Sequence, residues 1–187
     1  MAAMAYPTTL IYKENSMKRV VVTGAECTGK STLTQALSAH YGEPWTAEYV
    51  REYVDQIGRE LKHEDLYPIA KGQIEGEDAL LPKAKRFVLH DTNLLSSILY
   101  AKHYFSTDIA WMNEAFINRE YTLYLLCLPD GIPWQEDPGQ RESPSARIKF
   151  HGYFKESLDR LELPYAELTG KEEVRISQAT RAIDAII

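Results

Sequence analysis

An apolar run followed directly by a glycine-bearing loop is the feature that most restricts how this chain can fold. Residues 19–23 read RVVVT, a β-branched run typical of a fully buried strand. The octapeptide GAECTGKS follows at 24–31 with the spacing Gly-x4-Gly-Lys-Ser. Residues 31–41 have the apolar pattern of a helix, with Leu33, Ala36, Leu37 and His40 on the face expected to be buried. A strand, this loop and a helix form the Walker A arrangement, in which backbone N–H groups and the helix N-terminus bind nucleotide phosphates.

The chemistry of a bound triphosphate predicts a role for each part of this loop. Lys30 would bring a positive charge to the β- and γ-phosphate oxygens, and the Ser31 hydroxyl would ligate Mg²⁺. Because such a loop works through its backbone, Cys27 is expected to be a tolerated variable position. The residues predicted to contact the nucleotide are Gly24, Glu26, Cys27, Thr28, Gly29, Lys30, Ser31, Thr32 and Thr169.

Strand-like apolar runs alternate with helical patterns along the chain. The expected strands cover residues 19–23, 43–47, 86–91, 121–128 and 164–168. This alternation favours a parallel sheet with right-handed crossovers and helices on both faces. The predicted fold is therefore α/β, a P-loop NTPase three-layer sandwich around a five-stranded parallel sheet. Residues 1–16 are expected to form an N-terminal extension and residues 17–187 a single domain.

Residues 48–61 are predicted to be an amphipathic helix with two distinct faces. Apolar residues recur at i, i+4, i+7 and i+11, which predicts a buried stripe. That stripe consists of Val50, Val54, Ile57 and Leu61. The opposite face carries Glu48, Arg51, Glu52 and Asp55. A further helix is expected over much of 64–84, and others at 94–105, 148–163 and 171–187.

Composition argues against several classes of partner. The net charge of −6 comes without a cluster of Lys or Arg, so a nucleic-acid partner is disfavoured. No apolar run approaches the roughly 20 residues that span a bilayer, and the N-terminus lacks the pattern of a signal peptide. The only cysteines, Cys27 and Cys127, fit a reducing compartment better than a disulfide framework. We therefore expect a cytoplasmic protein with a small-molecule substrate.

Asp91 ends the expected strand at 86–91, where a Walker B aspartate would help to hold Mg²⁺. The alternative is that Asp91 or Thr92 caps the helix that follows. Hydrolytic P-loop motors commonly place a glutamate after this aspartate, and here the residue is Thr92. The Asn-Lys-x-Asp motif by which GTPases read guanine is absent from the sequence. Both observations favour transfer of a phosphate to an acceptor over its transfer to water.

In compact P-loop kinases the segment between the second and third strands holds the acceptor, and here that segment is 48–85. Glu48, at its start, could take the proton of an attacking hydroxyl as a general base. Arg51, one turn further on, could bind a ribose or a phosphate. The alternative is a solvated helix face on which Arg51 pairs with Glu48 and Asp55.

The proline-rich segment 129–148 lies between the fourth and fifth strands, which is the position of a lid. Its Arg141 and Arg147 could reach the charge that develops on the γ-phosphate. Trp134 could stack on a base or anchor the loop on the core. The alternative is a surface loop with unpaired charges.

Five segments together resemble one family. GAECTGKST, AEYVRE, LYPIAKGQ, HDT and PWQEDPGQR occur in the order seen in ribosylnicotinamide kinase domains, and the resemblance covers about 18–187. Those domains occur fused to a nicotinamide-mononucleotide adenylyltransferase in bifunctional NAD-salvage proteins. The Walker A part is shared with many families, whereas the ordered combination of the other four segments is much more specific.

The resemblance implies an adenylate-kinase-like core that uses ATP and Mg²⁺ to phosphorylate the 5′-hydroxyl of nicotinamide riboside. It implies that Asp91 helps to hold Mg²⁺ and that Arg141 and Arg147 belong to the lid. The implied riboside pocket comprises Glu48, Tyr49, Arg51, Glu52, Tyr67 and Gln73. Trp134 is kept as one further candidate for substrate binding.

The chain departs from this family at two positions, both on the acceptor side. Ala47 stands where family members carry an aromatic residue before the Glu-Tyr pair, and Trp45 lies two residues earlier. Asn93 stands where they tend to carry a second acidic residue. Two alternatives therefore stay open, which are a kinase for another nucleoside or nucleotide and an ATP-binding regulatory module without phosphotransfer.

Overall fold

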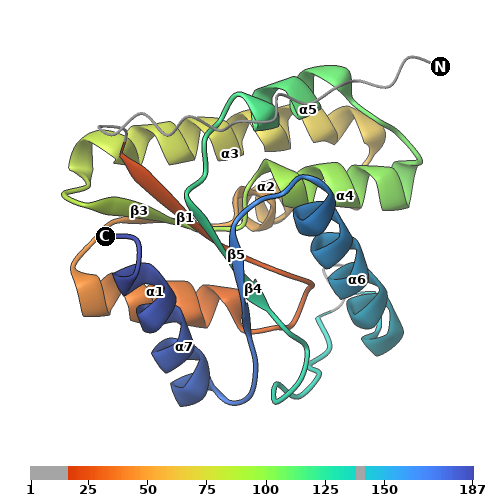
Figure 1. Cartoon of the computed structure of the whole chain (residues 1–187). Helices are drawn as coiled ribbons and strands as arrows, with labels where there is room; N and C mark the ends of the chain where they lie inside the picture. The colour runs from red at the N-terminus through yellow and green to blue at the C-terminus, as the bar shows by residue number, and fades with distance from the viewer. Residues whose placement is uncertain (1–16, 138–141) are drawn as a thin grey trace.

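A parallel sheet of five strands forms the centre of the chain (Figure 1). The computed structural model describes residues 17–137 and 142–187, so the predicted extension at 1–16 and the lid residue Arg141 lie outside it. The strand order is β2-β3-β1-β4-β5, and every pair is parallel, as predicted. The strands are β1 (Lys18–Thr23), β2 (Trp45–Thr46), β3 (Phe87–Asp91), β4 (Leu123–Cys127) and β5 (Tyr165–Leu168).

Helices cover both faces of the sheet and complete the three-layer sandwich that the sequence predicted. The α-helices are α1 (Lys30–Tyr41), α2 (Tyr49–Ile57), α3 (Leu66–Leu80), α4 (Leu94–Phe105), α5 (Ala110–Ile117), α6 (Pro144–Arg160) and α7 (Glu172–Asp184). Short 3₁₀ turns, η1 (His63–Asp65) and η2 (Leu81–Lys83), flank α3. None of the helices in the described ranges is both long and apolar enough to cross a membrane. The cytoplasmic location stays a prediction from the sequence.

Alternation along β1 produces two separate cores. Val20 and Val22 face α1 and α7, where they pack with Leu37 and Ile183. Val21 faces the opposite side, where α3, α4, α5 and α6 pack against the sheet. Successive side chains of a strand point to opposite faces, so an apolar strand needs a cover on each side. Figure 1 shows α1 and α7 together on one side of the sheet.

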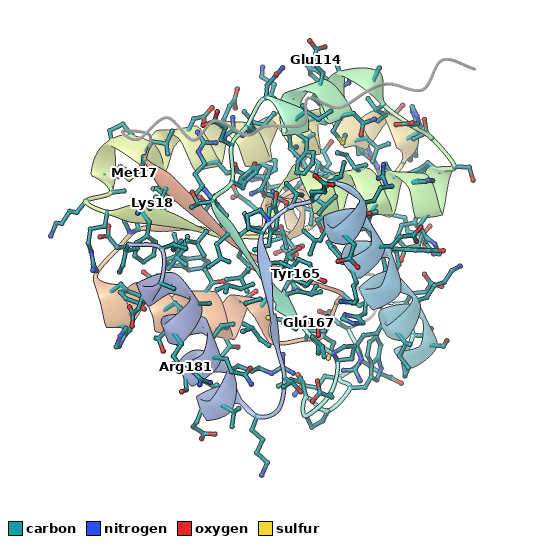
Figure 2. All side chains as sticks on the ribbon, in the orientation of Figure 1. Met17, Lys18, Glu114, Tyr165, Glu167 and Arg181 are labelled. Atoms are coloured by element: carbon teal, nitrogen blue, oxygen red, sulfur yellow. The ribbon has the colours of Figure 1, made fainter. Side chains whose placement is uncertain are left out.

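The edge strand β5 is tied to α6 by polar contacts. Lys155 Nζ on α6 donates to Tyr165 Oη at 2.8 Å and to Glu167 Oε1 at 2.6 Å. Figure 2 labels the Tyr165 and Glu167 side chains on β5. Charged residues and a covering helix both protect an edge strand from pairing with another chain.

Three helices differ from the sequence prediction. In α2 the predicted stripe is only half-buried, and the helix ends at Ile57, before Leu61. The reason is its position beside β2, a two-residue edge strand, where α3 is its main neighbour. On α1, His40 was expected on the buried face and is exposed. α6 begins at Pro144 and not at 148, because Ser143 Oγ accepts the Ala146 N–H and caps it.

Candidate functional site

The loop between β1 and α1 lies at the carboxyl ends of the strands. Gly24 has φ +129°, and a Cβ there would lie 2.7 Å from the Cys127 carbonyl oxygen, so only glycine fits. Gly29 is the N-cap of α1, whose first turn has no capping side chain and no acidic residue among the described residues. The first N–H groups of α1 are therefore available to an anion, which the helix dipole also favours.

Lys30 carries the positive charge of this loop. Its Nζ donates to the Ala25 carbonyl at 2.8 Å, and the Thr28 hydroxyl donates to the same oxygen at 2.8 Å. The Lys30 side chain is therefore folded across the loop, and the residue is only 8% exposed. A cation that protein covers on most sides interacts with a phosphate more strongly than an exposed one does.

Asp91 lies at the end of β3, opposite Val22 of β1 and beside the start of α1. It is 2% exposed, it accepts a hydrogen bond from the Ser31 hydroxyl, and its Oδ1 has no partner among the described residues. The pKa of Asp91 is raised to about 6, first by burial and then by the nearby Glu48 carboxylate, while Lys30 opposes this rise. A buried carboxylate oxygen without a partner, next to a hydroxyl, is a donor set that fits Mg²⁺.

The turn after Asp91 corrects one alternative from the sequence. Neither Asp91 nor Thr92 caps α4, because Asn93 is the N-cap and its Oδ1 accepts the Leu95 N–H at 3.2 Å. Asn93 Nδ2 also donates to Tyr124 Oη at 3.0 Å. Thr92 has φ +66°, which is unusual for a β-branched residue, and its N–H donates to Val22 O at 3.0 Å. The Asp91 side chain therefore lies at the end of β3 and takes no part in capping α4.

The first turn of α2 brings a second carboxylate to the site. Glu48 occupies the N-cap position but makes no capping hydrogen bond with its side chain. Its Oε2 instead accepts Arg51 Nε at 3.0 Å, and Arg51 Nη1 lies 3.8 Å from Asp137. The Arg51 pKa is raised, because Glu48, Asp91 and Asp137 together outweigh the opposing effect of burial. The structure thus places Arg51 within a group of carboxylates.

Two cavities meet at these residues. We call the first, of about 340 Å³, the P-loop cavity; its lining includes Lys30, Ser31, Arg51, Ile132, Pro133 and Arg175. We call the second, of about 640 Å³, the α2 cavity; its lining includes Ser31, Trp45, Glu48, Arg51, Glu52 and Asp91. Both volumes lie in the range of small-molecule sites. Ser31 and Arg51 line both cavities, so the two spaces adjoin.

The described part of the predicted lid rests on the P-loop. Arg147 Nη1 donates to Cys27 O at 3.1 Å and to Ile132 O at 3.0 Å, and its guanidinium lies 5.6 Å from the Trp134 ring centroid. The Glu142 N–H donates to Glu26 Oε1 at 2.9 Å. The contact described for Trp134 is thus with an arginine of the same segment. Trp134 as a substrate contact and Arg147 as a catalytic residue remain predictions.

Of the residues predicted at the site outside the P-loop and the lid, four line neither cavity. Tyr67 is 57% exposed and packs edge-on against Trp111. Thr169 donates its hydroxyl to Asp130 and its N–H to Gln178 Oε1. Gln73 is 3% exposed, and its Oε1 accepts the Tyr49 N–H at 3.1 Å, so both belong to the contact between α2 and α3. The structure therefore does not bring these four residues to the cavity walls as it does Glu48, Arg51, Glu52 and Asp91.

Arg175 on α7 is a site residue that the sequence analysis missed. It is 2% exposed and lines the P-loop cavity. Its guanidinium donates to four backbone carbonyls, those of Thr28, Leu128, Asp130 and Gly170. It therefore joins the P-loop to the ends of β4 and β5. The helical spacing could have indicated that Arg175 is buried, because it falls at i−4 and i−8 from the buried Ala179 and Ile183.

Comparison with known proteins identifies a family model that matches most of this chain. Residues 19–175 match the family model described as an AAA domain. The trifunctional NAD biosynthesis/regulator protein NadR of Escherichia coli strain K12 is 25% identical over 178 residues, covering 91% of this chain and 42% of that protein. The chain thus spans less than half the length of this curated relative. The resemblance indicated by the sequence is confirmed by these matches.

Solved structures share the fold. A NadR protein in complex with NR has a TM-score of 0.78 at 23% identity, covering 90% of this chain and 50% of the other. A NadR protein in complex with NAD and AMP-PNP has a TM-score of 0.77 at 23% identity, with 90% and 49% covered. Thymidylate kinase of Ehrlichia chaffeensis has a TM-score of 0.62 at 15% identity, with 92% and 100% covered. The predicted P-loop kinase fold is confirmed.

Proposed function

The chain belongs to the AAA domain family, and from that premise and the paired cavities we propose that it transfers phosphate from ATP to a nucleoside. The first candidate acceptor is nicotinamide riboside, with nicotinamide mononucleotide as the product. The relative named as an NAD biosynthesis protein and the similar NadR structures with NR and with AMP-PNP support this choice.

One observation carries the proposal: the two cavities adjoin and share Ser31 and Arg51 in their walls. The P-loop cavity fits the triphosphate, because the first turn of α1 and Lys30 line it. The α2 cavity fits the acceptor, because it opens beside the same phosphate end and its lining includes the Glu48 and Asp91 carboxylates. A protein that only hydrolysed or sensed a nucleotide would have no need of the second space.

Five side chains then have proposed roles. Ser31 and Asp91 would hold Mg²⁺, which when bound neutralises charge on the phosphates and helps to orient them. Lys30 would contact the β- and γ-phosphates, and Arg147 would add charge from the lid. Glu48 would accept the proton of the attacking hydroxyl, because its carboxylate lies on the acceptor side while Asp91 is bound to Ser31.

The charges around the α2 cavity favour a neutral or cationic acceptor over a monophosphate. Its lining contains four carboxylates, Glu48, Glu52, Asp55 and Asp91, and one cation, Arg51, which already pairs with Glu48. A further phosphate would meet like charge there. Nicotinamide riboside carries a cationic ring, and Trp45 in the same lining offers an aromatic face to such a cation.

The test is a coupled ADP assay with ATP, Mg²⁺ and a panel of nucleosides and their monophosphates. We expect nicotinamide riboside to accelerate ADP release. Glu48→Gln should lower kcat by about 10²–10⁴-fold at unchanged ATP affinity, because removal of a general base affects the chemical step. Glu75→Gln, an exposed site on α3, is the matched control. If ADP is released at the same slow rate without an acceptor and with each acceptor of the panel, the proposal is refuted and a regulatory module is favoured.

A further inference from the structure

The N-terminus of α2 is capped from another helix. An N-cap side chain ordinarily accepts the N–H of the second or third helical residue. Glu48 holds this position, yet its carboxylate bonds to the Arg51 side chain and no backbone N–H. The N–H of Tyr49, the first helical residue, donates instead to Gln73 Oε1 on α3 at 3.1 Å. Gln73 thus accepts an N–H that the helix itself leaves unpaired.

Glu77 fixes the orientation of the Gln73 amide. Gln73 Nε2 donates to Glu77 Oε1 at 3.3 Å, and a carboxylate can only accept. The amide oxygen of Gln73 must therefore face Tyr49. Glu77 is fully buried, and its Oε2 accepts Tyr121 Oη at 2.9 Å and Arg119 Nη2 at 3.1 Å. The side-chain oxygen and nitrogen of Gln73 and both carboxylate oxygens of Glu77 are thereby hydrogen-bonded, the condition under which a buried network orders its members.

This network links the start of α2 to the centre of the sheet. Arg119 and Tyr121 lie just before β4, and the Thr122 N–H donates to Arg19 O of β1 at 2.8 Å. Tyr49 also packs directly on α3, where a Cβ at Gly72 would lie 2.1 Å from its ring. α2 has only half-buried apolar residues, so these contacts set its position more than its apolar stripe does.

We propose that Gln73, oriented by Glu77, is a positioning residue that caps α2 and so leaves the Glu48 carboxylate directed at the acceptor hydroxyl. This rests on the proposed phosphotransfer function, in which Glu48 is the base. Without Gln73, the Glu48 side chain would be the nearest group able to satisfy the first turn of α2, and capping would compete with its pairing to Arg51. Gln73 and Glu77 touch neither cavity, so they act through the position of Glu48.

The experiment compares four variants of the whole chain. Gln73→Met keeps the length of the side chain and removes the acceptor, and Glu77→Gln removes the group that orients Gln73. The double variant Q73E/E77Q restores a complete chain, since Glu at 73 accepts from Tyr49 and from the amide at 77. Glu75→Gln on the exposed face of α3 is the matched control. Each is assayed for kcat, for KM of ATP and of nicotinamide riboside, and for amide exchange at Tyr49.

For Gln73→Met we expect kcat to fall at least about tenfold at unchanged KM for ATP, since small misplacements of a catalytic group cost about this much or more. Exchange at Tyr49 should speed up. Glu77→Gln should likewise lower kcat at unchanged KM for ATP. Q73E/E77Q should recover kcat to within about threefold of the parent value, which is the result expected when two sites are coupled. The inference would be overturned if kcat of Gln73→Met equals that of the parent, or if kcat of the double variant is lower than that of both single variants.

A failure of the proposed function is a different result, because the parent protein would then transfer no phosphate. The cap is still tested in that case by exchange at Tyr49. Faster exchange in Gln73→Met but not in Glu75→Gln supports the cap, and equal exchange overturns it.

Discussion

Replacing Asp91 with asparagine should stabilise the protein at neutral pH while removing the proposed metal ligand. Asp91 is 2% exposed, and burial together with Glu48 raises its pKa from the usual 3.8 to about 6. One pKa unit corresponds to about 1.4 kcal/mol, so the ionised carboxylate costs the fold roughly 3 kcal/mol. Asparagine has a similar shape and no charge. Asp91→Asn should therefore raise the free energy of unfolding at pH 7 by about 2–3 kcal/mol.

The sign of the pH dependence follows from the direction of the shift. Below about pH 4 Asp91 is protonated in both the folded and the unfolded chain, so it makes no difference to stability. Between about pH 4 and pH 6 the folded state holds the proton more tightly, and the stability of the parent protein falls as pH rises. Above about pH 6 the cost is constant. The advantage of Asp91→Asn should grow over this window and then level off.

Urea unfolding at pH 4, 5, 6 and 7 measures this difference directly. Asp55→Asn is the matched control, since Asp55 lines the same cavity but is exposed. Its difference from the parent should stay small at every pH. If Asp91→Asn is no more stable than the parent at pH 7, or if its advantage does not change with pH, the reasoning from burial is wrong.

Three further substitutions test the scaffold of the site. Gly24→Ala should unfold at a lower temperature and lose ATP binding, because its Cβ would lie 2.7 Å from Cys127 O at φ +129°. In steady-state kinetics, Arg175→Lys should raise the KM for ATP about tenfold and leave the KM for the acceptor unchanged. The reason is that a lysine ammonium cannot reproduce the hydrogen bonds of the planar Arg175 guanidinium to four backbone carbonyls. Asn93→Ala should cost about 1–3 kcal/mol in urea unfolding, since it removes a cap and leaves Tyr124 Oη unpaired.

Matched controls make these predictions specific. Gly152→Ala on α6, where a Cβ meets nothing within 4 Å, should not destabilise the protein. Arg181→Lys, at an exposed position of the same helix as Arg175, should leave the KM for ATP unchanged. Equal effects at Gly24 and Gly152, or at Arg175 and Arg181, would contradict the roles given to Gly24 and Arg175. Equal stability of Asn93→Ala and the parent would contradict the capping role of Asn93.

Local pattern was sufficient to predict the sheet and the phosphate loop. A buried parallel strand is a continuous apolar run, and the glycine spacing at 24–31 has a steric cause that acts within the loop and its neighbouring strand. The carboxyl ends of β1 and β3 adjoin in any sheet of this type. Asp91 could therefore be placed beside the loop from its position at a strand end.

The remaining features depend on contacts between distant segments. Periodicity predicted which face of α2 is apolar, but how deeply that face is buried depends on the short strand β2 and on α3. The resemblance implied that Gln73 belongs to the riboside pocket, and its hydrogen-bond partners in the structure are the Tyr49 N–H and Glu77. Arg175 binds backbone carbonyls, which every residue has, so no sequence motif marks its partners.

The contact between Arg175 and the P-loop has a consequence for how the protein is made. Arg175 and Thr28 are 147 residues apart, and the ribosome completes the P-loop long before α7 leaves it. A nascent chain therefore has its phosphate-binding loop early but lacks the arginine that joins this loop to the ends of β4 and β5. Nucleotide affinity should therefore rise only after α7 has left the ribosome and Arg175 has reached the P-loop.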